Sequence, residues 1–258
     1  MLIHNPKGHY HFLKGIDPYS CGVIADPAYE IVNVTLKSPI PWREGFAQID
    51  AYLKEQGQGR TALCAMQLRS PTPFTMEGFI DFNRGYCEVL QEWGLYVDEL
   101  NPLARTNVAP LIDPPASPTL YGFSYMFPCD DAAQLTFIIA GAGELLEAAL
   151  NSEGIVRRGE TDRDAIREKA TYVVEVMEER LLGLGGTWDA VNRINIYTVH
   201  PISELVEDIV LPKLVASKGH GIHWYPSRPP IVDIEYEMDM RGVVRELYVD
   251  FSRGKRET

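Results

Sequence analysis

The chain has 258 residues, enough for one large domain or for two of about 130 residues, each with a stable core. Its apolar fraction of 45% and aromatic fraction of 10% are typical of a globular protein, and no apolar run is long enough to cross a bilayer. The formal charge of −12 argues against nucleic acid and acidic membranes as partners, because both bind clustered Lys and Arg, whereas a small carboxylate can still bind where a few arginines reverse the local potential.

The cysteines are widely spaced and form no CxxC pair; they are Cys21, Cys64, Cys87 and Cys129. This spacing argues against a zinc knot and is typical of free, mostly buried thiols in a reducing compartment. No signal peptide is recognised, so the sequence predicts a cytoplasmic protein.

The first half of the chain is predicted to have the order β-β-β-α-β-α-β-β. Its strands, recognised as β-prone runs between turn residues, are 9–13, 21–25, 29–36, 61–68, 103–112 and 119–127. Pro39 and Pro41 are expected to end the third strand. One helix then runs from Trp42 until Gly57, and the other has an apolar face at residues 79–93.

The second half repeats much of this order. Its predicted elements are a strand at 135–140, a glycine-containing bend at 141–144, a weak strand at 155–156, a helix from Thr161 to residue 184, a strand at 190–199, a helix at 202–214 and two strands within 219–240. Each half closes with a strand, a proline corner and a strand. This recurrence predicts a tandem duplication with its boundary near residues 127–131, and hence domains of residues 1–128 and 129–258.

Residues 219–240 hold the densest group of candidate functional side chains. Two histidines, two aromatic residues and Arg228 lie just before or within a rigid diproline corner. Every second residue after the corner is acidic, and the period of a strand places these acids on one face. They are Asp233, Glu235, Glu237 and Asp239. If the chain is an enzyme, much of its site is expected here.

Four short motifs, found in the expected order, resemble motifs of the RidA/YjgF superfamily of trimeric enamine/imine deaminases. They are FIDFNRGY at 79–86 (the DFxxxNxxY helix), ARTNV at 104–108 (the PARTxV strand), GGTWDAVNRINIYT at 185–198 (the GGS–DDVVKVTVYL step) and VDIE at 232–235 (the VEIE strand). The resemblance implies an α/β (α+β) fold of two tandem chorismate-mutase-like (RidA/YjgF-type) β-α-β-α-β-β units, with helices packed on one face of a mixed sheet. It also implies a homo-oligomer, with the trimer as the family's assembly and sites in clefts between units.

The same resemblance carries the family's carboxylate-binding arginine onto Arg105 and its water-activating glutamate onto Glu235. These residues lie in different halves, which departs from the family's pattern. The first-half strand that corresponds to VEIE lacks the acid, and its polar residues Tyr121 and Ser124 are candidate substrate-binding groups. In the second half Arg228 is the candidate replacement for the arginine. Two incomplete halves would then build one composite site, and the loss of one set of clefts is the open alternative.

The chemistry of these side chains suits such roles. Arg105 and Arg228 offer planar guanidinium forks for carboxylates. A partly desolvated Glu235 would have a raised pKa and could pass a proton between water and a leaving amine. His223, whose ordinary pKa is near neutrality, is a second candidate proton carrier. A structural role for each of the four is the open alternative.

Two histidine pairs have spacings that metal sites use. His9 and His11 alternate along one predicted strand, and His220 and His223 lie three positions apart. Neither pair has the cysteines or the HExxH context of a known metal motif, so the sequence predicts no metal, and the family resemblance implies no other cofactor.

The resemblance implies a hydrolytic, cofactor-independent deaminase of small enamine or imine carboxylic acids, with 2-aminomuconate-type products of aromatic ring cleavage as the favoured substrates. Two alternatives stay open. A chorismatase-like hydrolase is one, because that group resembles fused YjgF-type units and binds a carboxylate-bearing enol ether. A non-catalytic, small-molecule-binding oligomeric protein is the other, because motif residues are missing from both halves. Ammonia release, pyruvate release from chorismate, or neither would separate the three.

Overall fold

The structure is a computed structural model that describes residues 1–130, 135–146, 151–214 and 217–251. Its strands are β1 (Leu2–Asn5), β2 (Tyr10–Leu13), β3 (Gly22–Ala25), β4 (Tyr29–Pro41), β5 (Leu63–Arg69), β6 (Ala104–Pro110), β7 (Thr119–Pro128), β8 (Phe137–Gly143), β9 (Arg193–Thr198), β10 (His223–Arg228), β11 (Glu237–Gly242) and β12 (Arg245–Val249). Its α-helices are α1 (Trp42–Glu55), α2 (Met76–Glu92), α3 (Arg163–Gly183) and the short α4 (Ser203–Leu205). Shorter turns are the 3-10 segments η1 (Arg60–Ala62), η2 (Ser152–Gly154), η3 (Trp188–Ala190) and η5 (Ser217–His220), and the π-helical η4 (Val206–Val210).

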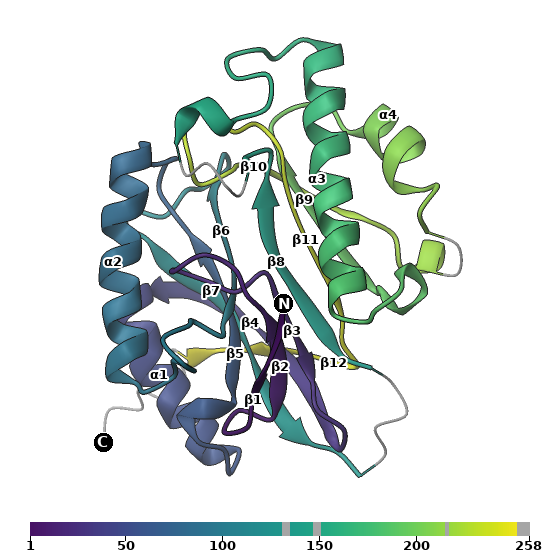
Figure 1. The fold of residues 1–258 in the computed structure, drawn as a ribbon. Helices are drawn as coiled ribbons and strands as arrows, with labels where there is room; N and C mark the ends of the chain where they lie inside the picture. Colours follow the sequence, from purple (N-terminus) through teal and green to yellow (C-terminus); the bar gives the residue numbers. More distant parts are fainter. Residues whose placement is uncertain (131–134, 147–150, 215–216, 252–258) are drawn as a thin grey trace.

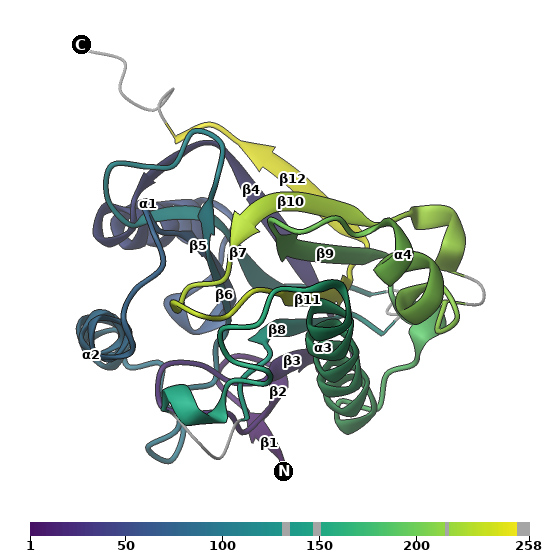
Figure 2. The ribbon, with the colours of Figure 1, turned by 90° about the horizontal axis from the view of Figure 1, so that it is seen from above.

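The named strands form one 12-stranded mixed sheet within the described ranges, in the order β1-β2-β3-β8-β11-β9-β10-β6-β5-β7-β4-β12. In Figure 1, α1 and α2 lie to one side of the strands, and α3 and α4 lie to the other. The view from above in Figure 2 shows the same separation, with the strands between the two pairs of helices.

The prediction of two tandem RidA/YjgF-type units is wrong, because strands from both ends of the chain are exchanged between the halves. β3, near the N-terminus, pairs antiparallel with β8, and β12, near the C-terminus, pairs parallel with β4. β10 and β6 join the halves in the middle of the sheet. The edge N–H and C=O groups of each half are thus satisfied by the other. A domain boundary near residue 128 stays a prediction, and residue 131, at the end of the predicted boundary region, lies outside the described residues.

β4 continues to Pro41, beyond its predicted end. β12 covers the outer edge of β4 only as far as Leu36, and only β7 pairs with the last residues of β4. The prolines therefore cost no hydrogen bond on the outer edge, which is where strands tolerate proline. β1 and β12 are absent from the prediction, because both are short edge strands with a weak apolar alternation.

The long second-half helix is close to its prediction, but the neighbouring elements differ. α3 begins after Asp162, whose carboxylate accepts the N–H groups of Asp164 and Ala165, as an N-cap residue does. The helix predicted at 202–214 is a single α-turn, α4, followed by the π-helical η4. The strand predicted near residue 155 is only an isolated bridge between Leu145 and Ile155.

Two clusters of buried apolar side chains hold the helices to the sheet. The first packs α1 and α2 against β4 to β7, with Phe46, Ile49 and Tyr86 on the buried helix faces. The second packs α3 against β8, β9 and β11, with Val173 and Met177 on its buried face. None of the helices in the described ranges is both long and apolar enough to span a membrane.

Candidate active site

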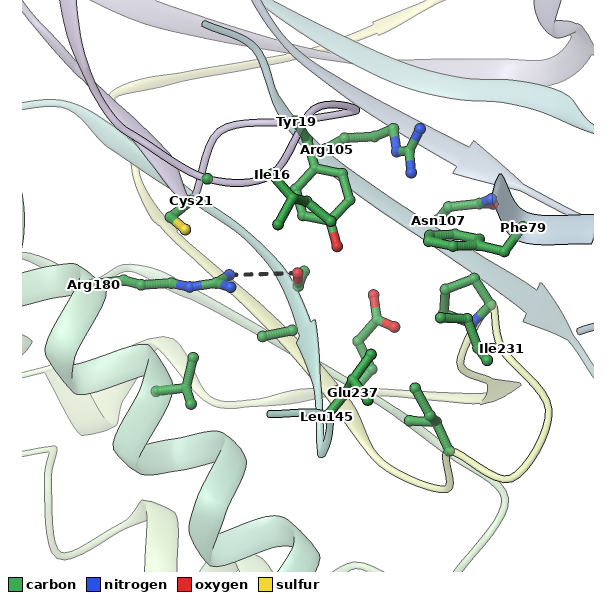
Figure 3. Close-up of a pocket in the computed structure, with 17 residues that line it drawn as sticks. Ile16, Tyr19, Cys21, Phe79, Arg105, Asn107, Leu145, Arg180, Ile231 and Glu237 are labelled. Carbon is green, nitrogen blue, oxygen red and sulfur yellow. Dashed lines mark hydrogen bonds between the residues drawn. The ribbon is translucent and has the colours of Figure 1, made fainter. Parts of the chain in front are cut away.

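A cavity lies where the sheet brings β6 opposite β8 and β11 (Figure 3). β6 and β8 are not neighbours in the sheet, yet a Cβ added to Gly141 of β8 would lie 3.1 Å from a methyl carbon of Thr106 on β6. The same Cβ would collide with the carboxylate of Glu237 on β11. Glycine at position 141 therefore permits the close approach that places Glu237 in the cavity.

Arg105 of β6 is a buried cation held by aromatic rings. Its side chain is 3% exposed, and its guanidinium carbon lies 4.9 Å from the ring centroid of Tyr19 and 4.8 Å from that of Tyr86. The ring of Phe79 lies 5.7 Å away. Nη1 of Arg105 has no hydrogen-bond partner among the described residues. A buried guanidinium that is held by rings and still has a free N–H group is suited to bind an anion that enters the cavity.

Glu237, the first residue of β11, is the acid of this cavity. Its side chain is 4% exposed, and Figure 3 shows its carboxylate pointing into the cavity, toward the hydroxyl of Tyr19. Within the described part of the chain, the carboxylate accepts no hydrogen bond and forms no ion pair. Burial raises the pKa of Glu237 well above its usual range, the nearby carboxylate of Asp239 raises it further, and Arg105 opposes the shift. The carboxyl therefore stays protonated to a higher pH than an exposed glutamate does.

Two more polar side chains reach the cavity from outside the sheet. Tyr19 comes from the loop between β2 and β3, and burial raises the pKa of its hydroxyl, so it is a proton donor at neutral pH. Arg180 comes from α3, and its Nη1 donates to the carbonyl oxygens of Ala140 at 3.0 Å and Gly141 at 3.4 Å. These bonds fix a second positive charge against β8.

Asn107 adds a neutral donor two residues after Arg105. Its Oδ1 accepts the hydroxyl hydrogen of Ser70 at 3.0 Å, while its Nδ2 is buried without a partner among the described residues. A buried amide N–H without a partner is costly, and an oxygen atom of a bound ligand would satisfy it.

A buried ion pair fixes the backbone just before Glu237. Lys169 Nζ lies 3.0 Å from Glu144 Oε1, and both side chains are 0% exposed. The same carboxylate accepts the backbone N–H groups of Glu235 at 2.6 Å and Tyr236 at 3.0 Å. Glu144 thus prevents these two residues from joining β11, which begins at Glu237.

The sequence-predicted residues are divided between this cavity and other places. Arg105 lines the cavity. Glu235 and Arg228 lie together, with 3.6 Å between Oε2 and Nη1, but neither is among the described residues that line the cavity. Glu235 also accepts a hydrogen bond from His200 Nε2 at 2.8 Å, and Arg228 is 46% exposed.

The other three candidates, His223, Tyr121 and Ser124, are not among the described residues that line this cavity. The ring of His223 contacts the guanidinium of Arg193, and partial burial, together with Arg193, lowers the pKa of His223. Tyr121 lies under the guanidinium of Arg69, with 3.9 Å from the guanidinium carbon to the ring centroid, in a separate surface groove. Ser124 is buried and donates to the side-chain oxygen of Asn33.

The sequence contained signals for some of the residues that were missed. Asn107 follows Arg105 at the spacing that puts two side chains on the same face of a strand. Arg180 interrupts the apolar stripe of α3, where a charged residue needs a buried partner or a ligand. Glu237 belongs to the run of alternating acids, but the pattern alone does not show which acid is buried. No local pattern indicates Tyr19.

Two comparisons of the sequence with known proteins find aminomuconate deaminases. A sequence model of the family described as 2-aminomuconate deaminase CnbZ matches residues 2–247. The 2-amino-5-chloromuconate deaminase of Comamonas testosteroni is 40% identical over 250 residues, which cover 95% of this chain and 97% of that protein.

Among solved structures, a chorismatase has a TM-score of 0.51 at 13% identity, covering 90% of this chain and 79% of that one. A cyanuric acid hydrolase has a TM-score of 0.40 at 10% identity, covering 86% and 70%. The likeness to chorismatase concerns the fold, and together with the continuous sheet it replaces the predicted pair of RidA/YjgF-type units.

Proposed function

The chain belongs to the family of the 2-aminomuconate deaminase CnbZ, and we propose that it hydrolyses the C–N bond of 2-aminomuconate-type dicarboxylates in the cavity between Arg105 and Glu237. The observation that carries this assignment is a buried carboxyl with a raised pKa that shares a cavity with a buried, incompletely hydrogen-bonded guanidinium. Hydrolysis of an enamine that carries carboxylates requires a proton donor and a group that binds an anion. Both are buried in this one cavity.

Substrate binding follows from the unsatisfied donors. A 2-aminomuconate molecule carries an enamine conjugated with two carboxylates. One carboxylate would accept N–H groups from Arg105 Nη1 and Asn107 Nδ2, two buried donors without hydrogen-bond partners among the described residues. Arg180, on the α3 side of the cavity, would contribute positive potential to the other end of the dianion.

Glu237 would carry the proton through the whole reaction. Its carboxyl first gives a proton to a carbon of the conjugated enamine, which becomes an iminium ion, and the carboxylate is left facing a cation. The carboxylate then takes a proton from water as the water oxygen bonds to the iminium carbon, and a carbinolamine results. Finally the carboxyl protonates the amine, ammonia leaves, and the hydroxyl proton returns to Glu237 as the carbonyl forms. One water is consumed, one ammonia is released, and Glu237 ends protonated.

The environment of Glu237 suits it both to donate a proton and to accept one. In the resting state burial raises the pKa of the carboxyl and so favours the protonated form, which can donate. Once the iminium forms, its positive charge stabilises the carboxylate, so the same group becomes the base for water. The hydroxyl of Tyr19, which points at this carboxyl in Figure 3, would hold the attacking water or the departing amine.

The test compares two acids of the same segment. Glu237→Gln should lower kcat for ammonia release from 2-aminomuconate roughly 100- to 10,000-fold, the usual contribution of a general acid or base. Glu235→Gln, which changes the acid hydrogen-bonded to His200, is the matched control and should keep most of the activity. If Glu235→Gln loses as much as Glu237→Gln, the pair of Glu235 and Arg228 belongs to the reaction and the assignment of the cavity fails.

The alternative functions have less support. The likeness to chorismatase is confined to the fold at 13% identity, so chorismate should yield no pyruvate with this enzyme. The expected homo-oligomer stays part of the proposal, and its size can be measured by light scattering coupled to size-exclusion chromatography.

A further inference from the structure

A cluster of two histidines and an aspartate lies at the edge of the sheet, apart from the cavity. His4 on β1 and His11 on β2 are directly opposite in the antiparallel register, so their side chains project from the same face. Asp26 follows β3, the next strand, which pairs with β2. His4 Nε2 lies 2.9 Å from Asp26 Oδ2, and His11 Nδ1 lies 2.8 Å from Asp26 Oδ1.

The potential ligand atoms of these three residues converge. One atom from each lies within 4.8 Å of the other two. Ligands about 2.0 to 2.2 Å from a tetrahedral Zn²⁺ are roughly 3.4 Å from one another, so one ion could be reached by all three with small rotations of the side chains. Two imidazole nitrogens and one carboxylate oxygen are a ligand set that Zn²⁺ uses.

The cluster is also held in place before any ion binds. The backbone N–H of Asp26 donates to the carbonyl of His9 at 3.0 Å, and its own carbonyl accepts the N–H of Tyr29 at 3.1 Å. The side chain of Asp26 is only 15% exposed, whereas those of His4 and His11 are 49% and 38% exposed. A fixed carboxylate below two histidines that solvent can reach gives an ion both an anchor and a path of entry.

We propose that His4, His11 and Asp26 form a Zn²⁺ site with a water molecule as fourth ligand. The ion would link β1 and β2 to the residue that follows β3. Among the described strands β1 pairs with β2 alone, so the ion would add a second connection at this edge of the sheet. The loop between β2 and β3 supplies Tyr19 to the cavity, so the site stabilises the segment that carries this residue.

Titration of ZnCl₂ into the full chain, after dialysis against a chelator, tests the proposal by isothermal calorimetry. The wild type should bind one Zn²⁺ per chain, and His11→Ala and Asp26→Asn should each bind at least tenfold more weakly. Asp26→Asn keeps the size of the side chain, so a loss there is not a loss of folding. His220→Ala, which removes another exposed histidine, is the control and should bind as the wild type does.

A second measurement distinguishes this site from the cysteines. A 100-fold excess of Zn²⁺ over its dissociation constant should raise the Tm of the wild type by about 5 °C and leave that of His11→Ala unchanged. Co²⁺ in place of Zn²⁺ should give no thiolate charge-transfer band. Absence of binding, equal binding by wild type and His11→Ala, or a thiolate band that places the ion on Cys87 or Cys129 would each overturn the proposal.

Discussion

Lys169→Met should destabilise the protein by roughly 3 to 5 kcal/mol, the usual loss when one member of a buried ion pair is removed. Lys169 and Glu144 are both 0% exposed, and the ammonium also donates to the carbonyl of Val156 at 2.9 Å. Methionine fills a similar volume but leaves the carboxylate in the interior with only its backbone donors. For a chain of this size the loss corresponds to a fall in Tm of roughly 10 °C.

The loss should also depend on pH, with a definite sign. Burial already raises the pKa of Glu144, while the N–H of Glu235 and the charge of Lys169 oppose the shift. Without Lys169 the folded-state pKa rises further, and a raised carboxyl pKa gives stability at low pH that is lost as pH rises through the folded value. The deficit of Lys169→Met should therefore be small near pH 4 and grow toward neutral and alkaline pH.

Urea unfolding followed by circular dichroism, at several pH values, measures this difference. Lys213→Met is the matched control, because Lys213 and Glu178 form an ion pair of 2.7 Å whose side chains are 35% and 31% exposed. Such a pair contributes less than about 1 kcal/mol. If Lys169→Met loses no more than this control, or loses the same amount at every pH, the buried pair does not stabilise the segment before Glu237 in the way described.

Glu237→Gln should melt at a higher temperature than the wild type at alkaline pH and at the same temperature near pH 4, because ionisation of a carboxyl with a raised folded-state pKa costs stability only above its unfolded pKa of about 4.3. A constant difference across thermal melts between about pH 4 and pH 9 would contradict the raised pKa. Arg105→Met should raise KM for 2-aminomuconate roughly 10- to 100-fold in steady-state kinetics, and Arg105→Lys should recover only part of it, since lysine lacks the planar fork. Full recovery by lysine would mean that charge alone binds the carboxylate. Gly141→Ala should destabilise the protein by roughly 1 to 3 kcal/mol and lower kcat, because its Cβ would displace the carboxylate of Glu237, whereas Gly219→Ala, with no atom near its Cβ, should change neither.

The sequence analysis predicted Arg105, one residue of the proposed site, because the motif that carries it is local. Arg105 and Asn107 share one face of a short buried strand, and the motif around them is contiguous. The sequence alone could not show which of Glu235 and Glu237 lies in the cavity. Glu144 captures the N–H groups of Glu235 and Tyr236 across 91 and 92 positions, so the strand begins after them. A period of two places both acids on one face, and it gives no sign of this distant contact, which holds Glu235 outside the strand that begins at Glu237.

The fold, too, could be predicted from the sequence only where neighbouring residues determine it. The apolar periodicity of α1, α2 and α3 predicts helices near their observed bounds, because residues three and four positions apart form the buried face of a helix. The pairing of β3 with β8 and of β12 with β4 joins segments that are far apart in the sequence. The residues of a short strand do not indicate which distant strand it will pair with, and the prediction of separate units failed at these strands.

In the proposed reaction Arg105 binds a charge that stays constant, and Glu237 acts where the charge changes. The carboxylates of the substrate stay charged from binding to product release, so Arg105 should bind the ground state and the transition state about equally. Uniform binding of this kind lowers KM without raising kcat. The charge that does change develops between the enamine nitrogen, the attacked carbon and the proton donor, where the proposal places Glu237. Variants at Arg105 should therefore act mainly on KM, and variants at Glu237 mainly on kcat, and an Arg105 variant whose loss is entirely in kcat would place this guanidinium at the reacting atoms instead.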